Sequence, residues 1–279
     1  MSDLSPSAYK QQVLNDFNNR QNYENEFHRR AAARLVELAQ LQLGQTVLDV
    51  ATGTGLAAAA AAQAVGPEGQ VLGTDFSSGM LHQARQKIET LGLTNIRFEV
   101  ADADEQRLPE CCFDAILCSS AIVYLTDIPA ALGRWHAALK SGGTLAFSCL
   151  SEDSPSASAL FRAVVARHGL VIDNPNQILG TPLRCRQLLE AAGFGQISLV
   201  AEPLGFYLQD PEIGWTAHAK SAFGLQHVDW SDEKTAQCRQ EYVTALRQAA
   251  TADGYWNDIT MFYVTAQKVD GALNAAGAL

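Results

Sequence analysis

Short runs with consecutive apolar residues alternate with helical segments between residues 43 and 150. Examples are LGQTVLDV, QVLGTD and FDAILCS, and runs of this kind are typical of strands that are covered on both faces of a sheet. Alanine-rich or amphipathic segments separate these runs, and breakers such as GPEG end the segments. Strands that alternate with helices at this spacing predict parallel βαβ units with right-handed crossovers. The fold class we expect is therefore α/β, with a doubly wound and mostly parallel sheet.

The element boundaries follow from apolar periodicity and from glycine or proline breakers. We expect strands at residues 43–50, 70–75, 96–101, 113–119, 144–150, 196–201 and 258–268. We expect helices at residues 26–41, 56–65, 79–91, 128–140 and 184–192. The SGG that follows residue 140 places Gly142 for a left-handed helix cap. The first few residues and the closing GALNAAGAL have the composition of frayed ends.

The interval between the last two strands is too long for a plain loop. Within it, DPEIGWTAHAKSAFG and SDEKTAQCRQEYVTALRQAAT have helical character. Long insertions in α/β domains usually cover a site, so we expect a helical substrate cap between these two strands. The expected organisation is an N-terminal segment at 1–25 that is a candidate lid, a cofactor-binding core at 26–203 and 258–268, the cap at 204–257, and a flexible tail at 269–279.

The composition argues against several classes of protein. The 279 residues are 47% hydrophobic, which is enough for one large domain with a small cap. A net charge of −10 without any Lys/Arg cluster argues against nucleic acid as a partner. The polar start has no signal-peptide core, and the absence of a long apolar run argues against stable membrane insertion. Six cysteines without CxxC spacing predict free thiols and no metal site, as in a cytoplasmic protein.

The stretch VLDVATGTGLAAA, which starts at Val47, is the strongest indication of a ligand. Asp49 lies at the end of the first strand, and Gly53-Thr54-Gly55 opens the next helix. Glycine lets a ligand approach the backbone, and the helix start offers unpaired N–H groups and the positive end of a dipole. Alone, the glycine spacing also matches a dinucleotide site.

Three carboxylates narrow the choice of ligand. Asp75 ends the second strand, where it can bind both ribose hydroxyls, and Asp102 follows the third strand, where it can accept from an adenine amino group. Asp49 lies inside the turn, where it would repel a pyrophosphate but suit an ammonium or sulfonium group. The Tyr-x-x-x-Lys arrangement common in short-chain dehydrogenases is absent. S-adenosylmethionine therefore fits better than NAD.

Several motifs resemble those of class I S-adenosylmethionine-dependent methyltransferases. DVATGTG resembles their D/E-x-G-x-G-x-G motif, and TDFSSGMLHQAR is similar to their second motif. VADADEQRLPECCFD, LKSGGTLAFS and LRCRQLLEAAGFGQI look like later elements of the small-molecule branch that includes ubiquinone and menaquinone biosynthesis C-methyltransferases. The resemblance covers residues 27–268 and is weakest after Pro203. It implies a Rossmann-like, seven-stranded sheet whose last strand is antiparallel to the rest.

The resemblance also implies roles for residues of this sequence. Asp49 and the backbone from Ala51 to Gly55 would hold the methionine moiety, and Asp75 the ribose. This sequence departs from the family pattern at Ala51, where the first glycine usually stands. The cofactor-binding candidates are Tyr23, Asp49, Ala51, Thr52, Gly53, Gly55, Asp75, Phe76, Met80, Asp102, Ala103 and Ser119. Among these, Phe76 and Met80 would flank the adenine, Asp102 and the Ala103 N–H would read its edge, the Ser119 carbonyl would meet the amino group, and Tyr23 would close over the cofactor.

The acceptor site has no motif of its own. The (N/D)-P-P-(Y/F) tetrad of adenine and glutamine N-methyltransferases is absent after the fourth strand. Aromatic side chains near the cap could enclose a flat substrate, although Trp215 and Phe223 are better suited to the core of the cap. The substrate candidates are Tyr207, Trp215 and Phe223, and the candidates for a catalytic base are His218, His227 and Tyr124. We expect His82, His136 and His168 to be surface residues.

The function we expect is methyl transfer from S-adenosylmethionine to a carbon or oxygen of a small molecule. The acceptor would be a quinone, a phenol or a natural-product-like compound, and the product of the donor would be S-adenosylhomocysteine. An in-line displacement draws much of its rate from positioning and desolvation. Two alternatives stay open: N-methylation of a small amine, and a binding or regulatory protein that keeps the fold without the reaction. Asp49 and the missing Tyr-x-x-x-Lys arrangement disfavour an NAD oxidoreductase. The sequence leaves open whether the protein forms a homodimer.

Overall fold

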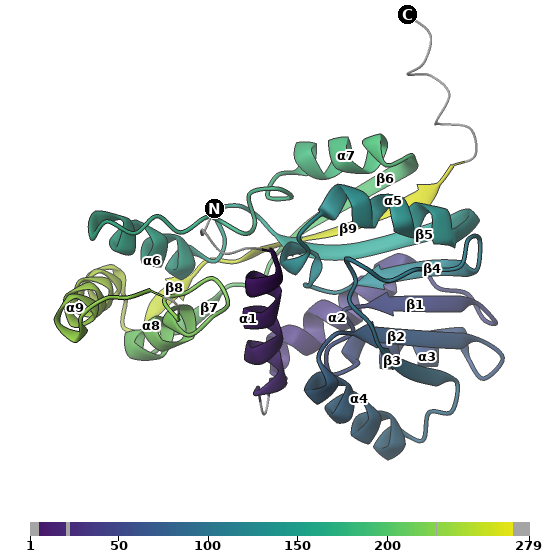
Figure 1. Cartoon of the computed structure of the whole chain (residues 1–279), viewed down its shortest axis with the longest axis horizontal. Coiled ribbons are helices and arrows are strands. Elements are labelled where there is room, and N and C mark those ends of the chain that lie inside the picture. The colour runs from purple at the N-terminus through teal and green to yellow at the C-terminus, as the bar shows by residue number, and fades with distance from the viewer. Residues whose placement is uncertain (1–5, 21–22, 227, 270–279) are drawn as a thin grey trace, which may run out of the picture. The chain divides into compact units, whose positions relative to one another are not determined.

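The computed structural model describes residues 6–20, 23–226 and 228–269 (Figure 1). The chain divides into two compact units. The larger unit comprises Phe17–Cys149, Thr181–Val200 and Phe262–Leu279, and the smaller unit comprises Met1–Asp16, Leu150–Gly180 and Ala201–Met261. The expected tail at 269–279 and the start of the N-terminal segment fall largely outside the described residues. Within the described ranges, no helix is long and apolar enough to cross a bilayer.

Seven strands form one sheet in the order β3-β2-β1-β4-β5-β9-β6, which can be followed in Figure 1. Neighbouring strands from β3 to β5 are parallel, and the last strand, β9, is antiparallel. The strand order reverses between β1 and β4, so the sheet is doubly wound as the alternation of elements predicted. The strands are β1 (Thr46–Val50), β2 (Gln70–Asp75), β3 (Ile96–Val100), β4 (Phe113–Cys118), β5 (Leu139–Leu150), β6 (Phe194–Pro203) and β9 (Thr260–Lys268).

Five α-helices and one short 3₁₀ helix complete the larger unit. They are α2 (Glu26–Ala39), α3 (Leu56–Val65), α4 (Ser78–Leu91), η1 (Ile122–Tyr124), α5 (Ile128–Ala138) and α7 (Pro182–Ala191). Side chains of Asn25, Ser77 and Asp127 cap the N-termini of α2, α4 and α5, respectively, by accepting from backbone N–H groups. Helix α3 begins at the glycine turn and buries five alanines. Because alanine is small, α3 can lie close against the sheet.

The prediction for Gly142 is wrong. Helix α5 ends at Ala138 and its cap residue is Leu139, so no left-handed glycine closes it. Strand β5 instead starts at Leu139 and includes Gly142, whose φ is +71°. The register between β4 and β5 shifts between Phe113 and Ala115. Gly142 therefore provides the positive φ that an irregularity in strand β5 requires. An SGG sequence fits such an irregularity and a helix cap equally well, so the sequence alone does not distinguish them.

The smaller unit contains residues 204–257, for which a cap was expected, and two helices that were not predicted from the sequence. Its elements are α1 (Pro6–Asn18), which continues into the larger unit, α6 (Ser156–Arg167), β7 (Phe206–Leu208), α8 (Pro211–Ala219), α9 (Asp232–Ala249) and β8 (Tyr255–Asn257). Strands β7 and β8 pair as an antiparallel ribbon. The unpredicted helices are α1 and α6. Helix α1 packs on the segment after α8, where Gln12 Nε2 donates to the Ala222 carbonyl at 2.8 Å.

Aromatic side chains from α6, α8 and α9 form the core of the smaller unit. Trp215 packs at 5.4 Å from Phe161 and at 5.8 Å from Tyr242, between ring centroids. Val243 and Leu246 of α9 extend the same buried cluster. Because α6 supplies Phe161, this core draws on residues 150–180 as well as on residues 204–257.

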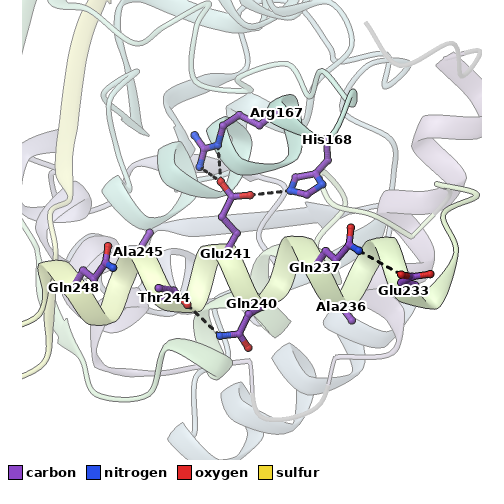
Figure 2. Close-up of a pocket in the computed structure, with 10 residues that line it drawn as sticks. All are labelled: Arg167, His168, Glu233, Ala236, Gln237, Gln240, Glu241, Thr244, Ala245 and Gln248. Carbon is purple, nitrogen blue, oxygen red and sulfur yellow. Dashed lines mark hydrogen bonds and ion pairs between the residues drawn. The ribbon is translucent and has the colours of Figure 1, made fainter.

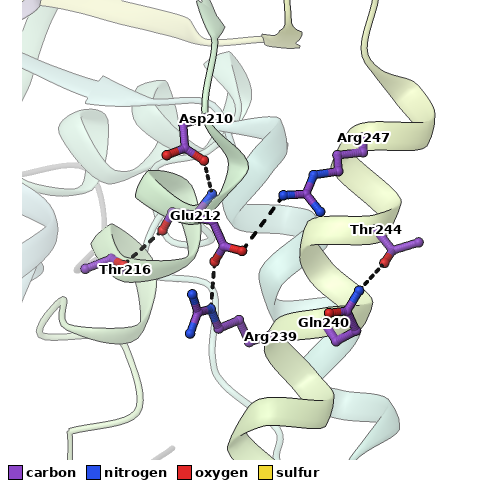
Figure 3. Close-up of polar contacts among 7 residues, drawn as sticks. All are labelled: Asp210, Glu212, Thr216, Arg239, Gln240, Thr244 and Arg247. Atoms are coloured by element: carbon purple, nitrogen blue, oxygen red, sulfur yellow. Dashed lines mark hydrogen bonds and ion pairs between the residues drawn. The ribbon is translucent and has the colours of Figure 1, made fainter.

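A half-buried carboxylate links α8 to α9 (Figure 3). Glu212 Oε2 accepts from Arg239 Nε at 2.6 Å, and Glu212 Oε1 lies 4.0 Å from Arg247. Both arginine side chains are more than half exposed, so water and salt screen the pairs. We expect Glu212→Gln to lower the free energy of unfolding by less than about 1 kcal/mol, and 1 M salt to remove most of the effect. Urea denaturation of a Glu212→Gln/Arg239→Gln double-mutant cycle measures this coupling, and a coupling that survives high salt contradicts the prediction.

Candidate functional site

The carboxyl ends of β1, β2 and β4 meet where the strand order reverses. Asp49 near the end of β1 is paired in register with Gly73 of β2 on one side and with Leu117 of β4 on the other. Asp75 is the last residue of β2, and Ser119 follows directly after β4. In a doubly wound sheet, this edge is where ligands bind.

The turn between β1 and α3 has an unusual backbone. Ala51, Gly53 and Gly55 have φ angles of +52°, +56° and +76°. The Thr52 N–H donates to the Thr74 carbonyl at 2.9 Å, which holds the turn against β2. A Cβ added at Gly53 would meet no heavy atom within 4 Å. The turn therefore leaves open space beside its backbone, as close approach of a ligand requires.

Gly55 has a different reason to be glycine. A Cβ at this position would lie 3.0 Å from Cζ of Phe98 and 3.2 Å from Cβ of Ala84, in addition to the strain of the positive φ. Gly55 thus allows the start of α3 to pack closely.

Ala51 carries strain that glycine would relieve. Its φ of +52° lies in the left-handed region, where an L-residue with a Cβ is disfavoured. We expect Ala51→Gly to raise the free energy of unfolding by about 0.5–1 kcal/mol. Glycine removes the strain of the positive φ, and its greater conformational freedom in the unfolded chain offsets part of that gain. Thermal and urea denaturation test this. Ala58→Gly within α3 is the matched control and should destabilise, whereas destabilisation by Ala51→Gly would show that the methyl group packs usefully.

Asp49 is a fully buried carboxylate with unmet hydrogen-bonding capacity. Its Oδ2 accepts from the Thr52 hydroxyl at 2.6 Å, but its Oδ1 has no hydrogen-bond partner among the described residues. Burial raises the pKa of Asp49 to about 7; the Thr52 hydroxyl and the Ala58 N–H oppose this, and the nearby Asp75 adds to it. A buried carboxylate of this kind is costly unless a ligand supplies a donor or a positive charge. The site therefore fits a ligand that carries an ammonium or sulfonium group.

Asp75 joins the glycine turn to the start of α4. Its Oδ2 accepts from the Gly53 N–H and its Oδ1 from the Ser77 N–H, both at 2.8 Å. Burial raises the pKa of Asp75, while these two N–H groups oppose the change. Each carboxylate oxygen keeps further acceptor capacity for a ribose hydroxyl. Of the two residues expected to flank adenine, Phe76 is half-buried and Met80 is buried in α4.

Asp102 and Ala103 lie in an ordered turn after β3. Asp102 Oδ1 accepts from the Asp104 N–H at 2.9 Å, and the Asp102 carbonyl accepts from two further backbone N–H groups. The Ala103 carbonyl accepts from Arg134 of α5 at 3.0 Å. Both residues remain partly exposed, so an adenine edge could reach them.

The loop after β4 places two more candidates. Ser119 is half-buried, and the next residue, Ser120, has a φ of +55°. The Ser120 N–H donates to Ser148 Oγ of β5 at 2.9 Å, which fixes the loop. Tyr124 follows in η1 and contacts Phe17 edge to face at 5.3 Å.

Residues 17–20 and 23–28, here called the N-terminal strap, are bound to the same edge. Asn18 Oδ1 accepts from Ser77 Oγ at 2.7 Å and from the Gly79 N–H at 3.1 Å. The Arg20 carbonyl accepts from Gln83 at 3.0 Å. Asn18 thus binds the same Ser77 that Asp75 holds, so the strap lies directly against the residues that follow β2.

Lys87 joins the strap to the glycine turn. Its Nζ pairs with Glu24 and also donates to the Thr54 carbonyl at 2.8 Å. Burial lowers the pKa of Lys87 to about 8. No sequence pattern marks Lys87 or Asn18, because only the folded chain brings these two residues to the turn.

Tyr23, the strap residue expected to close over the cofactor, stacks on His28. The ring centroids lie 4.3 Å apart, with 27° between the planes. Phe17 contacts Tyr23 at 5.8 Å, and the Arg20 guanidinium lies 4.7 Å from the Phe17 ring. Nothing in the sequence distinguishes His28, whose position three residues after Asn25 indicates only a helix start.

The cap candidates lie in separate environments within the smaller unit. Trp215 is 6% exposed in the core, which leaves it little surface for an acceptor. Tyr207 is 43% exposed on the ribbon and contacts Trp256 at 5.0 Å. Phe223 is half-buried and packs at 6.1 Å from Tyr9 of α1. The sequence could not distinguish these settings.

The candidates for a catalytic base include His218, which is half-buried in the smaller unit, and His227. Burial, assisted by the charge of Arg162, lowers the pKa of His218 to about 4. Its ring lies beside Phe161 at 5.6 Å, so His218 is neutral but weakly basic. His227 lies outside the described residues.

Two histidines expected at the surface are in fact half-buried and bonded. His136 Nε2 lies 3.1 Å from the Gly193 carbonyl, and its ring packs against Phe194. His168 Nε2 lies 2.8 Å from Glu241, which also pairs with Arg167 (Figure 2). Both predictions are wrong because tertiary contacts decide burial, whereas His82 is exposed as expected.

The groove around His168 is a weaker candidate for the site than the sheet edge. It has a volume of about 790 Å³ and runs along the outer side of α9 (Figure 2). Glu241 satisfies Arg167 and His168 there, so the groove presents no unpaired buried group like Asp49 Oδ1.

Known proteins share this fold and parts of this sequence. Residues 47–143 match the family described as "Methyltransferase domain". The aklanonic acid methyltransferase of Streptomyces sp. (strain C5) is 34% identical over 149 residues, 52% of this chain and 68% of that protein. Nocamycin O-methyltransferase of Saccharothrix syringae is 28% identical over 241 residues, 84% of this chain and 85% of that protein. A solved SAM-dependent methyltransferase from Aquifex aeolicus has a TM-score of 0.53 at 16% identity, covers 96% of this chain and 100% of its own, and shows the fold alone.

Proposed function

Because the chain belongs to the class I S-adenosylmethionine-dependent methyltransferases and methylates a small molecule, we propose that its acceptor is a quinone, a phenol or a natural-product-like compound. The methyl group goes to an oxygen or a carbon of that acceptor. The nocamycin relative, whose name specifies an O-methyltransferase, supports this proposal over most of the chain. S-adenosylmethionine is the methyl donor.

The observation that carries the cofactor assignment is the unpaired Oδ1 of the buried Asp49. The bound cofactor supplies a methyl group on a positively charged sulfur. Asp49 would accept a hydrogen bond from the methionine ammonium, and the N–H groups near Gly53 would lie against its carboxylate end. Asp75 would hold the ribose, and the turn at Asp102 and Ala103 would bind the adenine edge. These residues orient the donor, and orientation is what an in-line displacement chiefly needs.

The experiment that tests the proposal is an acceptor screen with the purified full chain. We expect the protein with S-adenosylmethionine to convert at least one phenol, hydroquinone or polyketide acid into a product heavier by one CH₂. S-adenosylhomocysteine should form in equal amount, and mass spectrometry detects both products. Asp49→Asn is the matched control and should form much less of both. Methylation of amines alone would contradict the proposed acceptor class while leaving the cofactor assignment intact.

A further inference from the structure

Two exposed cysteines of the larger unit lie next to each other at the start of β4. Cys111 and Cys112 directly precede Phe113, the first residue of this strand, and both are exposed, whereas the other four cysteines are buried. Their backbone N–H groups donate to the carbonyls of Ala137 and Ala138 at 3.0 and 2.9 Å, respectively. The turn that carries both thiols is therefore fixed against the end of α5.

The last residue of β9, Lys268, reaches the same turn. Strand β5 lies between β4 and β9, and β9 is antiparallel, so the carboxyl end of β9 lies at the edge where β4 begins. Lys268 Nζ donates to Cys111 Sγ at 3.7 Å. It also donates to the carbonyls of Leu139 and Ala137 at 2.8 and 3.4 Å. These three bonds use the donor capacity of the ammonium group and hold its positive charge beside the sulfur.

The two exposed thiols have different hydrogen-bond partners. Cys112 Sγ donates to the Glu110 carbonyl at 3.3 Å, an arrangement that requires the protonated thiol. Cys111 Sγ instead accepts from the Lys268 ammonium. It lies 4.0 Å from the Ala137 carbonyl, to which Lys268 already donates. The thiolate is the form of cysteine that attacks a disulfide, and a neighbouring positive charge favours that form. Of the two thiols, Cys111 is therefore the better nucleophile.

We propose that Cys111 is a modification site that exchanges with low-molecular-weight disulfides and becomes reversibly S-thiolated. The proton of the Cys111 thiol first passes to water. The thiolate then forms a bond to one sulfur of the disulfide, and the S–S bond of the disulfide breaks. Its electron pair leaves on the second sulfur, which takes up a proton. Cys111 is oxidised and one small thiol is released, so the disulfide is the oxidant and no other is needed.

The modification site is remote from the cofactor edge. Cys111 precedes the amino end of β4, whereas Ser119 follows the carboxyl end of the same strand and Asp49 lies near the carboxyl end of β1. Because β1 and β4 are parallel, their amino and carboxyl ends form opposite edges of the sheet. S-thiolation of Cys111 would thus change the surface of the protein without touching the residues that would hold S-adenosylmethionine.

The first test measures how fast each exposed thiol of the purified full chain reacts with oxidised glutathione at pH 7. Peptide mapping by mass spectrometry follows Cys111 and Cys112 separately. We expect Cys111 to react about tenfold faster than Cys112, and Lys268→Gln to remove most of this difference by slowing Cys111 alone. Lys268→Arg keeps the positive charge and should keep the preference, and Lys234→Gln in α9 is the matched control. Equal rates in the wild type, or an undiminished preference in Lys268→Gln, would overturn the proposal.

The second test measures whether the modification reaches the cofactor edge. Calorimetric titration with S-adenosylhomocysteine compares untreated wild type, wild type S-thiolated at Cys111, and Cys111→Ser exposed to the same oxidised glutathione. We expect the three affinities to agree within about twofold, because distant sites act independently, and dithiothreitol to restore the free thiol. An affinity that falls about tenfold or more in the modified wild type alone would contradict the remote position of Cys111.

Discussion

Asp49→Asn is expected to weaken the binding of S-adenosylmethionine by at least about 100-fold while making the ligand-free protein more stable. Loss of a charged hydrogen bond in a buried site costs several kcal/mol of binding free energy. Without ligand, however, the ionised carboxylate is buried with Oδ1 unpaired. Asparagine keeps an acceptor for the Thr52 hydroxyl and removes the buried charge. We therefore expect the free energy of unfolding to rise by roughly 2–4 kcal/mol at pH 8.

The pH dependence of this stabilisation has a definite sign. Burial raises the pKa of Asp49 from 3.8 to about 7, so between these values the native state holds a proton that the unfolded state has lost. The contribution of Asp49 to stability therefore falls as pH rises from about 4 to 7. The advantage of Asp49→Asn should grow through this window and level off above it. Urea denaturation of both proteins from pH 4.5 to 8.5 measures the difference.

Ligand binding provides a second measurement of the protonation state of Asp49. A cationic ligand favours the ionised carboxylate, so binding below pH 7 should release a proton and weaken as pH falls. Calorimetry in buffers of different ionisation enthalpy counts that proton. Asp114→Asn is the control, since this carboxylate pairs with Lys140 away from the site and its loss should leave ligand affinity unchanged. An Asp49→Asn variant that is destabilised at pH 8, or that binds as the wild type does, would contradict the role assigned to Asp49.

The second large effect is expected for Asp75→Ala. We expect the affinity for S-adenosylhomocysteine to fall by about 100-fold, because the carboxylate would hold both ribose hydroxyls. The variant also releases the N–H groups of Gly53 and Ser77, so we expect the free energy of unfolding to fall by about 1–3 kcal/mol. Calorimetric titration and urea denaturation measure the two losses.

A ligand without ribose hydroxyls separates recognition from stability. The wild type should prefer S-adenosylhomocysteine to its 2′,3′-dideoxy analogue, and Asp75→Ala should lose that preference. Asp75→Asn keeps one acceptor oxygen and should lie between the two. If the preference survives in Asp75→Ala, the residue supports the turn and does not bind the ribose.

Local patterns predicted the sheet and the cofactor edge. Continuous apolar runs marked β1, β2 and β4, and glycine spacing marked the turn before α3. Because the carboxyl ends of parallel strands share one edge, the positions of Asp49 and Asp75 followed from the strand boundaries alone. The unpaired Oδ1 and the strain at Ala51 are properties of the folded backbone, which the pattern does not specify.

Tertiary contacts determine what the sequence did not predict. Helix α1 is rich in polar residues, so its sequence shows no clear apolar face. The hydrogen bond from Gln12 to the Ala222 carbonyl holds this helix in place. His28 gains its environment from Tyr23, and Trp215 becomes core because α6 supplies Phe161. Each of these depends on residues distant in sequence or on the path of the strap, which periodicity does not report.

The most direct test of the account is calorimetric titration of the purified protein with S-adenosylmethionine, S-adenosylhomocysteine and NADH. The buried Asp49 beside an open glycine turn predicts micromolar binding of both adenosyl ligands and no binding of NADH, whose pyrophosphate the carboxylate would repel. Binding of NADH without binding of either adenosyl ligand would contradict the assignment of the edge and the function built on it.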